Sequence, residues 1–167
     1  MNKLKSIFYF VIIFGAAIGI LVWIAGPDDI SGGADNVVSA GNLILDEAFF
    51  DFGNISMAAG VVSHEFKVIN AGDGEEVINQ IYTSCMCTEA SFVTEDTKFG
   101  PFGMAGHGFI PKFNGKMGAG EEAIIKVDFD PAAHGPAGVG PVDRVVYVFR
   151  KGSDKPLELM FKAVVTP

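Results

Sequence analysis

Apolar and polar residues alternate along most of the chain after residue 43, and this period of two is the feature that most constrains the fold. In segment 156–165, for example, Leu157 and Leu159 fall on one face of an extended chain and Glu158 on the other. Such alternation is typical of strands with one buried face. The same alternation recurs in the segments 61–70 and 123–130, and the segments 43–53, 76–83 and 144–151 are further short strand-like runs. The soluble part of the chain is therefore predicted to be an antiparallel β-sandwich of about seven strands.

An uncharged run of 19 residues, from Ile7 to Ala25, precedes this region. The run is long enough to cross the hydrocarbon core of a membrane as one helix. Lys3 and Lys5 stand before it and Asp28 stands after it. The positive-inside rule then places the N-terminus in the cytoplasm and the rest of the chain outside.

We therefore expect residues 1–25 to be a short cytoplasmic start and a transmembrane anchor. The protein would be held in the cytoplasmic membrane as a single-pass protein, with its C-terminal domain outside the cytoplasm. A cleaved signal peptide is the alternative, although its apolar core is ordinarily shorter than this run. Residues 26–42 are rich in Gly, Asp and Ser and are predicted to be a flexible stalk, followed by the sandwich in residues 43–167.

Composition and missing motifs exclude several function classes. The formal net charge is −8 and no basic run is present, so a nucleic-acid partner is not expected. Hydrophobic residues make up 49% of the chain, enough to form a folded core. The sequence contains no phosphate-binding loop, no nucleophile elbow and no recognisable set of nucleophile and base. We therefore expect a protein that is not an enzyme.

Four motifs occur in a fixed order along the chain. They are FDFGNI at 50–55, HEFKVINAGDGE at 64–75, SCMCT at 84–88 and GAGEEAIIKVDFDP at 118–131. In this order they resemble a bacterial extracytoplasmic family, domain of unknown function 1573, whose members are similar to Hydin-type and major-sperm-protein-like immunoglobulin (Ig) folds. The chain departs from the family pattern at Met86, where the family has glycine, and at Ala119, where it has proline. The resemblance implies an Ig-like sandwich in the cell envelope with a non-enzymatic role. Our first hypothesis for the function is a binding or assembly module that acts on a protein or envelope partner.

The SCMCT motif holds both cysteines of the chain, Cys85 and Cys87. A disulfide between residues two apart would close a very small ring, and any strain in it would make it easy to reduce. Three hypotheses stay open: two small buried residues, a thiol–disulfide redox pair, or a soft-metal site.

The soft-metal hypothesis also involves Met104 and His107, which lie in the predicted long Gly-rich loop 84–120. Thiolates and thioethers select Cu(I), and imidazole suits copper as well. If the loop folds back over the end of the sandwich, Met104 and His107 would join Cys85 and Cys87 as Cu(I) ligands.

Three further residues near these motifs are not expected to bind a metal. Met86 should point away from the cysteines because alternate residues of an extended chain face opposite ways. His64 shares a strand face with apolar residues and is expected to pack at the rim of the core. His134 lies in a loop rich in proline and glycine and is expected to face solvent.

Overall fold

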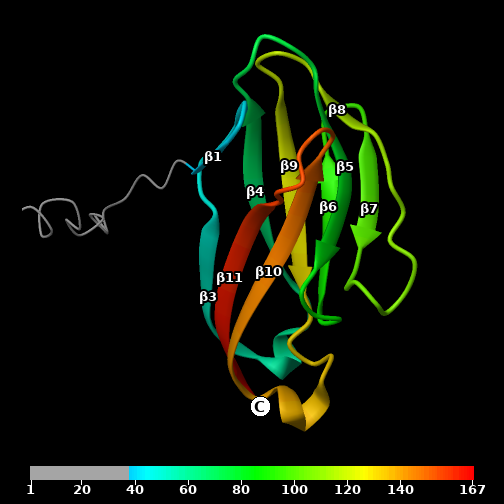
Figure 1. Cartoon of the computed structure of the whole chain (residues 1–167). Coiled ribbons are helices and arrows are strands. Elements are labelled where there is room, and N and C mark those ends of the chain that lie inside the picture. Colours follow the sequence, from blue (N-terminus) through cyan, green and yellow to red (C-terminus); the bar gives the residue numbers. More distant parts are fainter. Residues whose placement is uncertain (1–37) are drawn as a thin grey trace, which may run out of the picture. The chain divides into compact units, whose positions relative to one another are not determined.

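The computed structural model describes residues 38–167, which form a sandwich of two β-sheets (Figure 1). The predicted transmembrane helix over residues 7–25, and residues 26–37 of the predicted stalk, lie outside the described residues. Among residues 38–167, no helix is long and apolar enough to span a membrane.

The first sheet has six strands in the order β1-β2-β4-β9-β6-β7. They are β1 (Val38–Ala40), β2 (Leu43–Leu45), β4 (Val62–Asn70), β9 (Glu122–Phe129), β6 (Thr88–Val93) and β7 (Lys98–Phe102). The second sheet has five strands in the order β3-β11-β10-β5-β8. They are β3 (Phe49–Ser56), β11 (Leu157–Thr166), β10 (Gly140–Arg150), β5 (Glu76–Thr83) and β8 (Gly115–Met117). Within these two sheets every pairing is antiparallel except that of β3 with β11.

The predicted all-β, two-layer architecture is confirmed, but the described residues hold eleven strands rather than about seven. The predicted loop 84–120 contains β6, β7 and β8, and the end of the predicted stalk forms β1. These strands give no alternation signal, for identifiable reasons. In β6 only Glu89 is exposed, and the consecutive residues Ala90, Ser91 and Phe92 are all buried, so the alternation is lost. Strand β7 contains a proline, which ordinarily argues against a central strand, and it lies at a sheet edge. Strands β1 and β8 are only three residues long.

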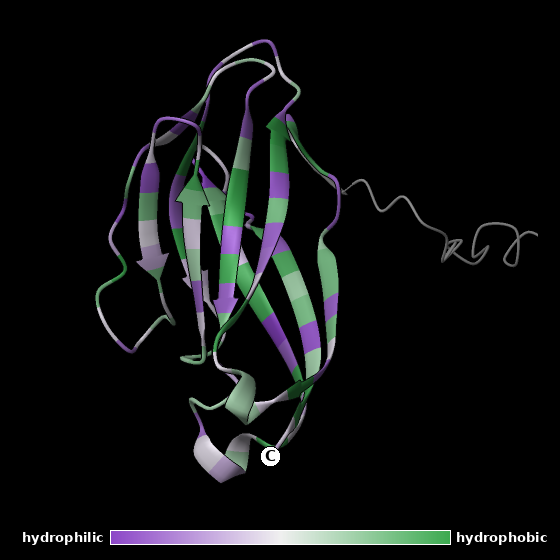
Figure 2. Ribbon diagram, turned by 180° about the vertical axis from the view of Figure 1, so that it is seen from behind, coloured by the Kyte–Doolittle hydropathy of each residue, from purple (hydrophilic) through white to green (hydrophobic). Residues whose placement is uncertain are grey.

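The core lies between the sheets and is rich in aromatic rings. Along the strands, apolar and polar residues alternate (Figure 2), and in β11 every second residue from Leu157 to Val165 is buried. The ring of Phe161 lies 5.3 Å from that of Phe52 and 5.2 Å from that of Phe129, measured between centroids. Burial of this apolar surface is the main stabilising contribution to such a fold.

Asn70 ends β4 and joins three segments of the chain. Its side chain is fully buried, and its Nδ2 donates to the backbone carbonyls of Gly74, Met117 and Gly118 at 2.7, 3.0 and 3.0 Å. Its Oδ1 accepts from the backbone N–H of Gly72 at 3.0 Å. One amide group therefore ties the turn after β4 to the end of β8.

Replacing Asn70 with alanine is expected to lower the free energy of unfolding by roughly 2–4 kcal/mol, because several hydrogen bonds are lost and buried carbonyls are left unpaired. Urea denaturation followed by circular dichroism measures this change. The matched control is Asn54→Ala, at an exposed position of β3, for which we expect a change within about 0.5 kcal/mol. Equal destabilisation by both substitutions would show that the buried amide has no special role.

Candidate metal and thiol site

The two cysteines lie in the turn between β5 and β6, which crosses from one sheet to the other (Figure 1). The backbone N–H of Thr88 donates to the carbonyl of Cys85 at 3.1 Å and closes the turn. The buried hydroxyl of Thr83 donates to the carbonyls of Cys85 and Thr88, each at 2.9 Å. Ser84 and Val145 of β10 exchange two further hydrogen bonds of 2.9 Å. The polar residues around the cysteines therefore fix the shape of the turn.

The turn brings the two sulfur atoms together. The Sγ atoms of Cys85 and Cys87 lie 2.8 Å apart, and both cysteines are free thiols. The side chain between them, Met86, is 53% exposed and does not share the site, in agreement with the prediction. Met86 avoids the site because it lies in a turn, whereas the prediction assumed an extended strand with alternating side chains.

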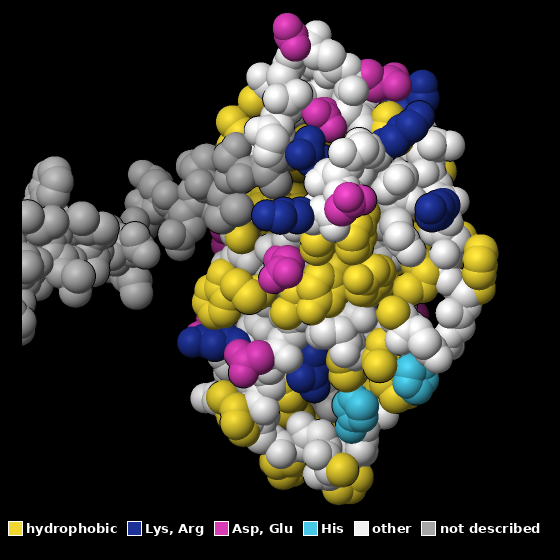
Figure 3. All heavy atoms as spheres, in the orientation of Figure 1, with side chains coloured by type: hydrophobic (Ala, Val, Ile, Leu, Met, Phe, Trp, Pro, Cys, Tyr) yellow, Lys and Arg dark blue, Asp and Glu magenta, His cyan; other side chains and the backbone are white. Residues whose placement is uncertain are grey.

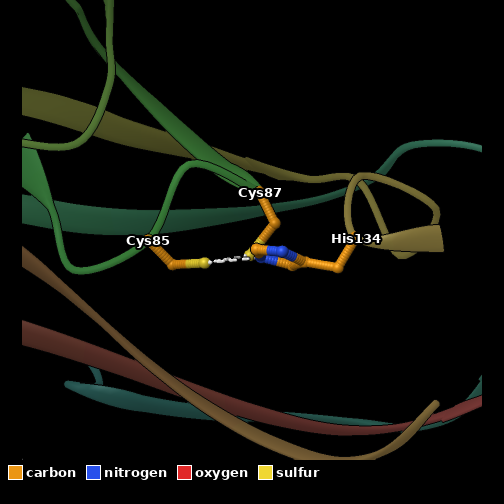
Figure 4. A group of neighbouring side chains, drawn as sticks. All are labelled: Cys85, Cys87 and His134. Carbon is orange, nitrogen blue, oxygen red and sulfur yellow. Dashed lines mark hydrogen bonds between the residues drawn. The ribbon is translucent and has the colours of Figure 1, made fainter. Parts of the chain in front are cut away.

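The third member of the group is His134, which the sequence did not assign to the site. Its Nε2 lies 3.1 Å from Cys85 Sγ, and Figure 4 shows the imidazole directed at the two sulfur atoms from the opposite loop. The residue itself is exposed, as expected, but its ring edge contacts a thiol. The two sulfur atoms and an imidazole nitrogen all lie within 4.8 Å of one another, so this group could hold a metal ion.

His134 lies in the connection from β9 to β10. Like the cysteine turn, this connection crosses from one sheet to the other. The backbone N–H of Asp130 donates to the carbonyl of Cys87 at 2.9 Å and holds the start of this loop against the turn. His134 immediately precedes the 3₁₀ helix η2 (Gly135–Gly138). A Cβ atom at Gly138 would lie 3.1 Å from the Cβ of His134, so glycine there allows the close approach.

Arg144, at the centre of β10, supplies a positive charge beside the thiols. Its Nε donates to Cys87 Sγ at 3.2 Å. Burial acts to raise the pKa of Cys85, but hydrogen bonds with Cys87 and His134 and the charge of Arg144 outweigh it and lower this pKa to about 7. Burial and the hydrogen bond to Cys85 raise the pKa of Cys87. Near neutral pH, Cys85 is therefore the thiol that ionises first.

The rate of alkylation of Cys85 by iodoacetamide in the metal-free protein should follow this ionisation. Because the thiolate is the reactive form, the rate is expected to rise about tenfold between roughly pH 6 and pH 8. The midpoint should lie at about 7. Mass spectrometry of the labelled peptides separates Cys85 from Cys87. A midpoint at about 8.5, the value of an ordinary thiol, would contradict the assigned contacts.

Met104 and His107 line a separate hollow rather than the cysteine site. Together with Met86 they line a hollow of about 380 Å³ beside the end of β7. The backbone of Met104 forms an isolated bridge with Thr83, but His107 is not part of the group of three donor atoms. Of the four predicted metal ligands, the structure thus brings Cys85 and Cys87 together and adds His134 as the nearby imidazole.

Sequence reasoning did not find His134 or Arg144. Both depend on the pairing of β5 with β10, in which Thr83 lies opposite Val146. That pairing brings the start of β10 and the loop before it to the end of β5, where the cysteines follow. The sequence does show that His134 lies just before the strand that contains Arg144. Alternation does not show which strands are neighbours in a sheet, so neither residue could be placed beside the cysteines.

Comparison with known proteins finds a family that part of this chain resembles. Residues 43–109 match the model of a protein family of unknown function, DUF1573. Over these residues the chain is similar to this family. The match confirms the resemblance over three of the four motifs, and the fourth, at 118–131, lies beyond the matched residues. The match includes both cysteines but ends before His134 and Arg144.

No curated protein matches this chain by sequence. Among solved structures, a protein of unknown function from Porphyromonas gingivalis W83 is similar, with 13% identity and a TM-score of 0.54. The alignment covers 82% of this chain and 51% of that one, so this chain spans about half the length of that protein. This likeness shows a shared fold.

Two further structures were found at lower similarity. The PapD-like domain 7 of human CEP192 has 9% identity and a TM-score of 0.46, covering 83% of this chain and 96% of that one. The YadV chaperone has 11% identity and a TM-score of 0.39, covering 75% of this chain and 52% of that one.

Proposed function

We propose that this protein binds one Cu(I) ion through Cys85, Cys87 and His134. The observation that carries the proposal is the position of the three donor atoms, which lie within 4.8 Å of one another at one end of the sandwich. Two thiolates and an imidazole are the soft and borderline ligands that favour copper.

The number of ligands favours Cu(I) over zinc. A closed structural zinc site uses four protein ligands, whereas the group found within residues 38–167 offers three. Charge favours Cu(I) as well. A Cu(I) ion with two thiolates carries one net negative charge, and the guanidinium of Arg144, which donates to Cys87 Sγ at 3.2 Å, supplies the compensating positive charge.

Binding requires the two sulfur atoms to move apart. They lie 2.8 Å from one another in this structure. Metal–sulfur bonds are about 2.3 Å long, so two sulfurs on one ion lie about 4 Å apart. Cys85 is only partly buried and lies in a turn, so we expect rotation of its side chain to provide most of this opening.

Anaerobic titration with Cu(I) against a chromophoric Cu(I) chelator tests the proposal. The full chain, purified in a mild detergent because of its apolar N-terminal run, should withdraw one equivalent of Cu(I) from the chelator. Failure to compete with the chelator, or equal competition by the protein after both thiols are alkylated, would refute it.

Location outside the cytoplasm is part of the proposal. Its support is the uncharged run 7–25 with lysines before it and aspartates after it. Protease added to spheroplasts should degrade the C-terminal domain and leave a cytoplasmic control protein intact. Protection of the domain until the membrane is dissolved would contradict this orientation.

The binding or assembly module, our first hypothesis from the sequence, remains a prediction. One surface feature favours it: the outer face of the five-stranded sheet carries a band of apolar side chains (Figure 3). Phe49 and Met160 lie opposite one another in this sheet and are 43% and 42% exposed. The rings of Tyr82 and Tyr147, also paired across strands, lie 5.1 Å apart.

A further inference from the structure

We propose that the metal-free cysteine pair also reduces disulfide bonds of other molecules, with Cys85 as the attacking thiol and Cys87 as the resolving thiol. This activity goes beyond Cu(I) binding and does not depend on it. The substrate class is an accessible disulfide bond, in a protein or in a small molecule.

The separation of the sulfur atoms favours formation of an internal disulfide. Cys85 Sγ and Cys87 Sγ lie 2.8 Å apart, and a disulfide bond is about 2.05 Å long. The two sulfurs therefore need to approach by less than 1 Å, which is a small side-chain movement. A resolving thiol this close acts as an intramolecular nucleophile, and a high effective concentration is the main advantage of such a reaction.

Unequal exposure assigns the two roles. Cys87 is 3% exposed, whereas Cys85 is only partly buried in the turn. A disulfide carried by another molecule must bring one of its sulfur atoms into line with the attacking thiolate, which a buried sulfur does not allow. Cys85 is therefore the sulfur that an external disulfide can reach.

Arg144 contacts the resolving thiol. Its Nε–H donates to Cys87 Sγ at 3.2 Å. A hydrogen bond from a guanidinium stabilises a thiolate more than a neutral thiol. Arg144 therefore favours ionisation of Cys87 when it attacks, and stabilises it as the leaving group when the reaction runs in reverse.

The reaction has two steps that balance. In the first, the Cys85 thiolate attacks one sulfur of the external disulfide, a mixed disulfide forms, and the other external sulfur leaves as a thiolate that takes a proton from water. In the second, the Cys87 thiolate attacks Cys85 Sγ, the Cys85–Cys87 bond forms, and the second external thiolate leaves and is protonated. The cysteine pair loses two electrons and two protons, and the external disulfide gains them.

Glutathione disulfide is the probe for this activity. The full chain, reduced and freed of metal in detergent, is mixed with it, and samples are quenched in acid and analysed by mass spectrometry. Wild-type protein should form the Cys85–Cys87 disulfide with only a transient adduct. Cys87→Ser should accumulate a glutathione adduct on Cys85, and Cys85→Ser should form an adduct on Cys87 at least about tenfold more slowly because Cys87 is buried.

Arg144→Met separates the two steps. We expect the second step to slow at least about tenfold, because Cys87 loses its hydrogen bond from a charged group. The first step should slow less, because Arg144 acts on Cys85 mainly through its charge. The mixed disulfide on Cys85 should therefore accumulate. The control is Lys162→Met, which removes a positive charge from an ion pair with Asp51 in the same sheet and should leave both steps unchanged.

Two results would overturn the proposal: wild-type protein that remains fully reduced, or equally fast adducts on Cys85 and Cys87 in the two serine variants. If a variant does not fold, as judged by circular dichroism, the site of the transient adduct in the wild-type protein decides between the two roles. Cu(I) titration of the same wild-type preparation keeps the two proposals distinct. Cu(I) binding without exchange refutes only the redox activity, and exchange without Cu(I) binding refutes only the metal site.

Discussion

Replacement of both Cys85 and Cys87 by serine is expected to abolish Cu(I) binding, with a loss of affinity of at least about a thousandfold. Serine hydroxyls have nearly the size of thiols but are hard, neutral donors that Cu(I) does not favour. Competition with a chromophoric chelator measures the affinity of each variant. The fold should be retained, because the turn is fixed by Thr83, Ser84 and Thr88 rather than by the sulfur atoms.

The histidines provide the matched comparison for this prediction. His134→Ala should weaken Cu(I) binding by about 10- to 100-fold, because the imidazole whose Nε2 lies 3.1 Å from Cys85 Sγ is removed. His107→Ala removes an exposed imidazole that lines a separate hollow and should leave the affinity unchanged. A larger loss for His107→Ala than for His134→Ala would favour the ligand set predicted from the sequence and contradict the proposed set of Cys85, Cys87 and His134.

Strand positions could be predicted from the sequence wherever a strand has one buried and one exposed face. The alternation in segments 61–70 and 123–130 corresponds to β4 and β9, which pair with one another. Alternation did not reveal β6, where consecutive residues are buried, or β8, which is too short to show a period of two. Burial on both faces depends on which elements pack together, and a local pattern does not contain that information.

The cysteine pair was predictable as a candidate site for chemistry because it is local in sequence. His134 was not predictable in this way, because 49 residues separate it from Cys85. Its position depends on two connections that cross between the sheets at the same end, and on the pairing of Thr83 with Val146. The hypothesis involving His107 assumed that a loop would fold over the thiols, whereas part of that segment forms strands β7 and β8.

Phe161→Ala is expected to lower the free energy of unfolding by about 3–5 kcal/mol. The side chain is 1% exposed and packs between the rings of Phe52 and Phe129, so its removal loses buried apolar surface and leaves a cavity. The strand that carries it, β11, pairs with both β3 and β10, so the surrounding rings have little freedom to fill the space. Urea denaturation measures the loss.

Phe109→Ala is the control for this change, because the same residue type is 91% exposed there. We expect a change within about 0.5 kcal/mol. Phe161→Leu should retain part of the packing and lose less than Phe161→Ala. Similar losses at positions 161 and 109 would contradict the placement of the core between the two sheets.

X-ray absorption spectroscopy of the Cu(I)-loaded full chain tests the central claim most directly. The proposed site predicts a first shell of two sulfur atoms and one nitrogen from imidazole, and in His134→Ala the nitrogen signal should disappear while both sulfurs remain. A wild-type shell without nitrogen, or a nitrogen signal that persists in His134→Ala and disappears in His107→Ala, would contradict the assignment of Cys85, Cys87 and His134 as the metal ligands.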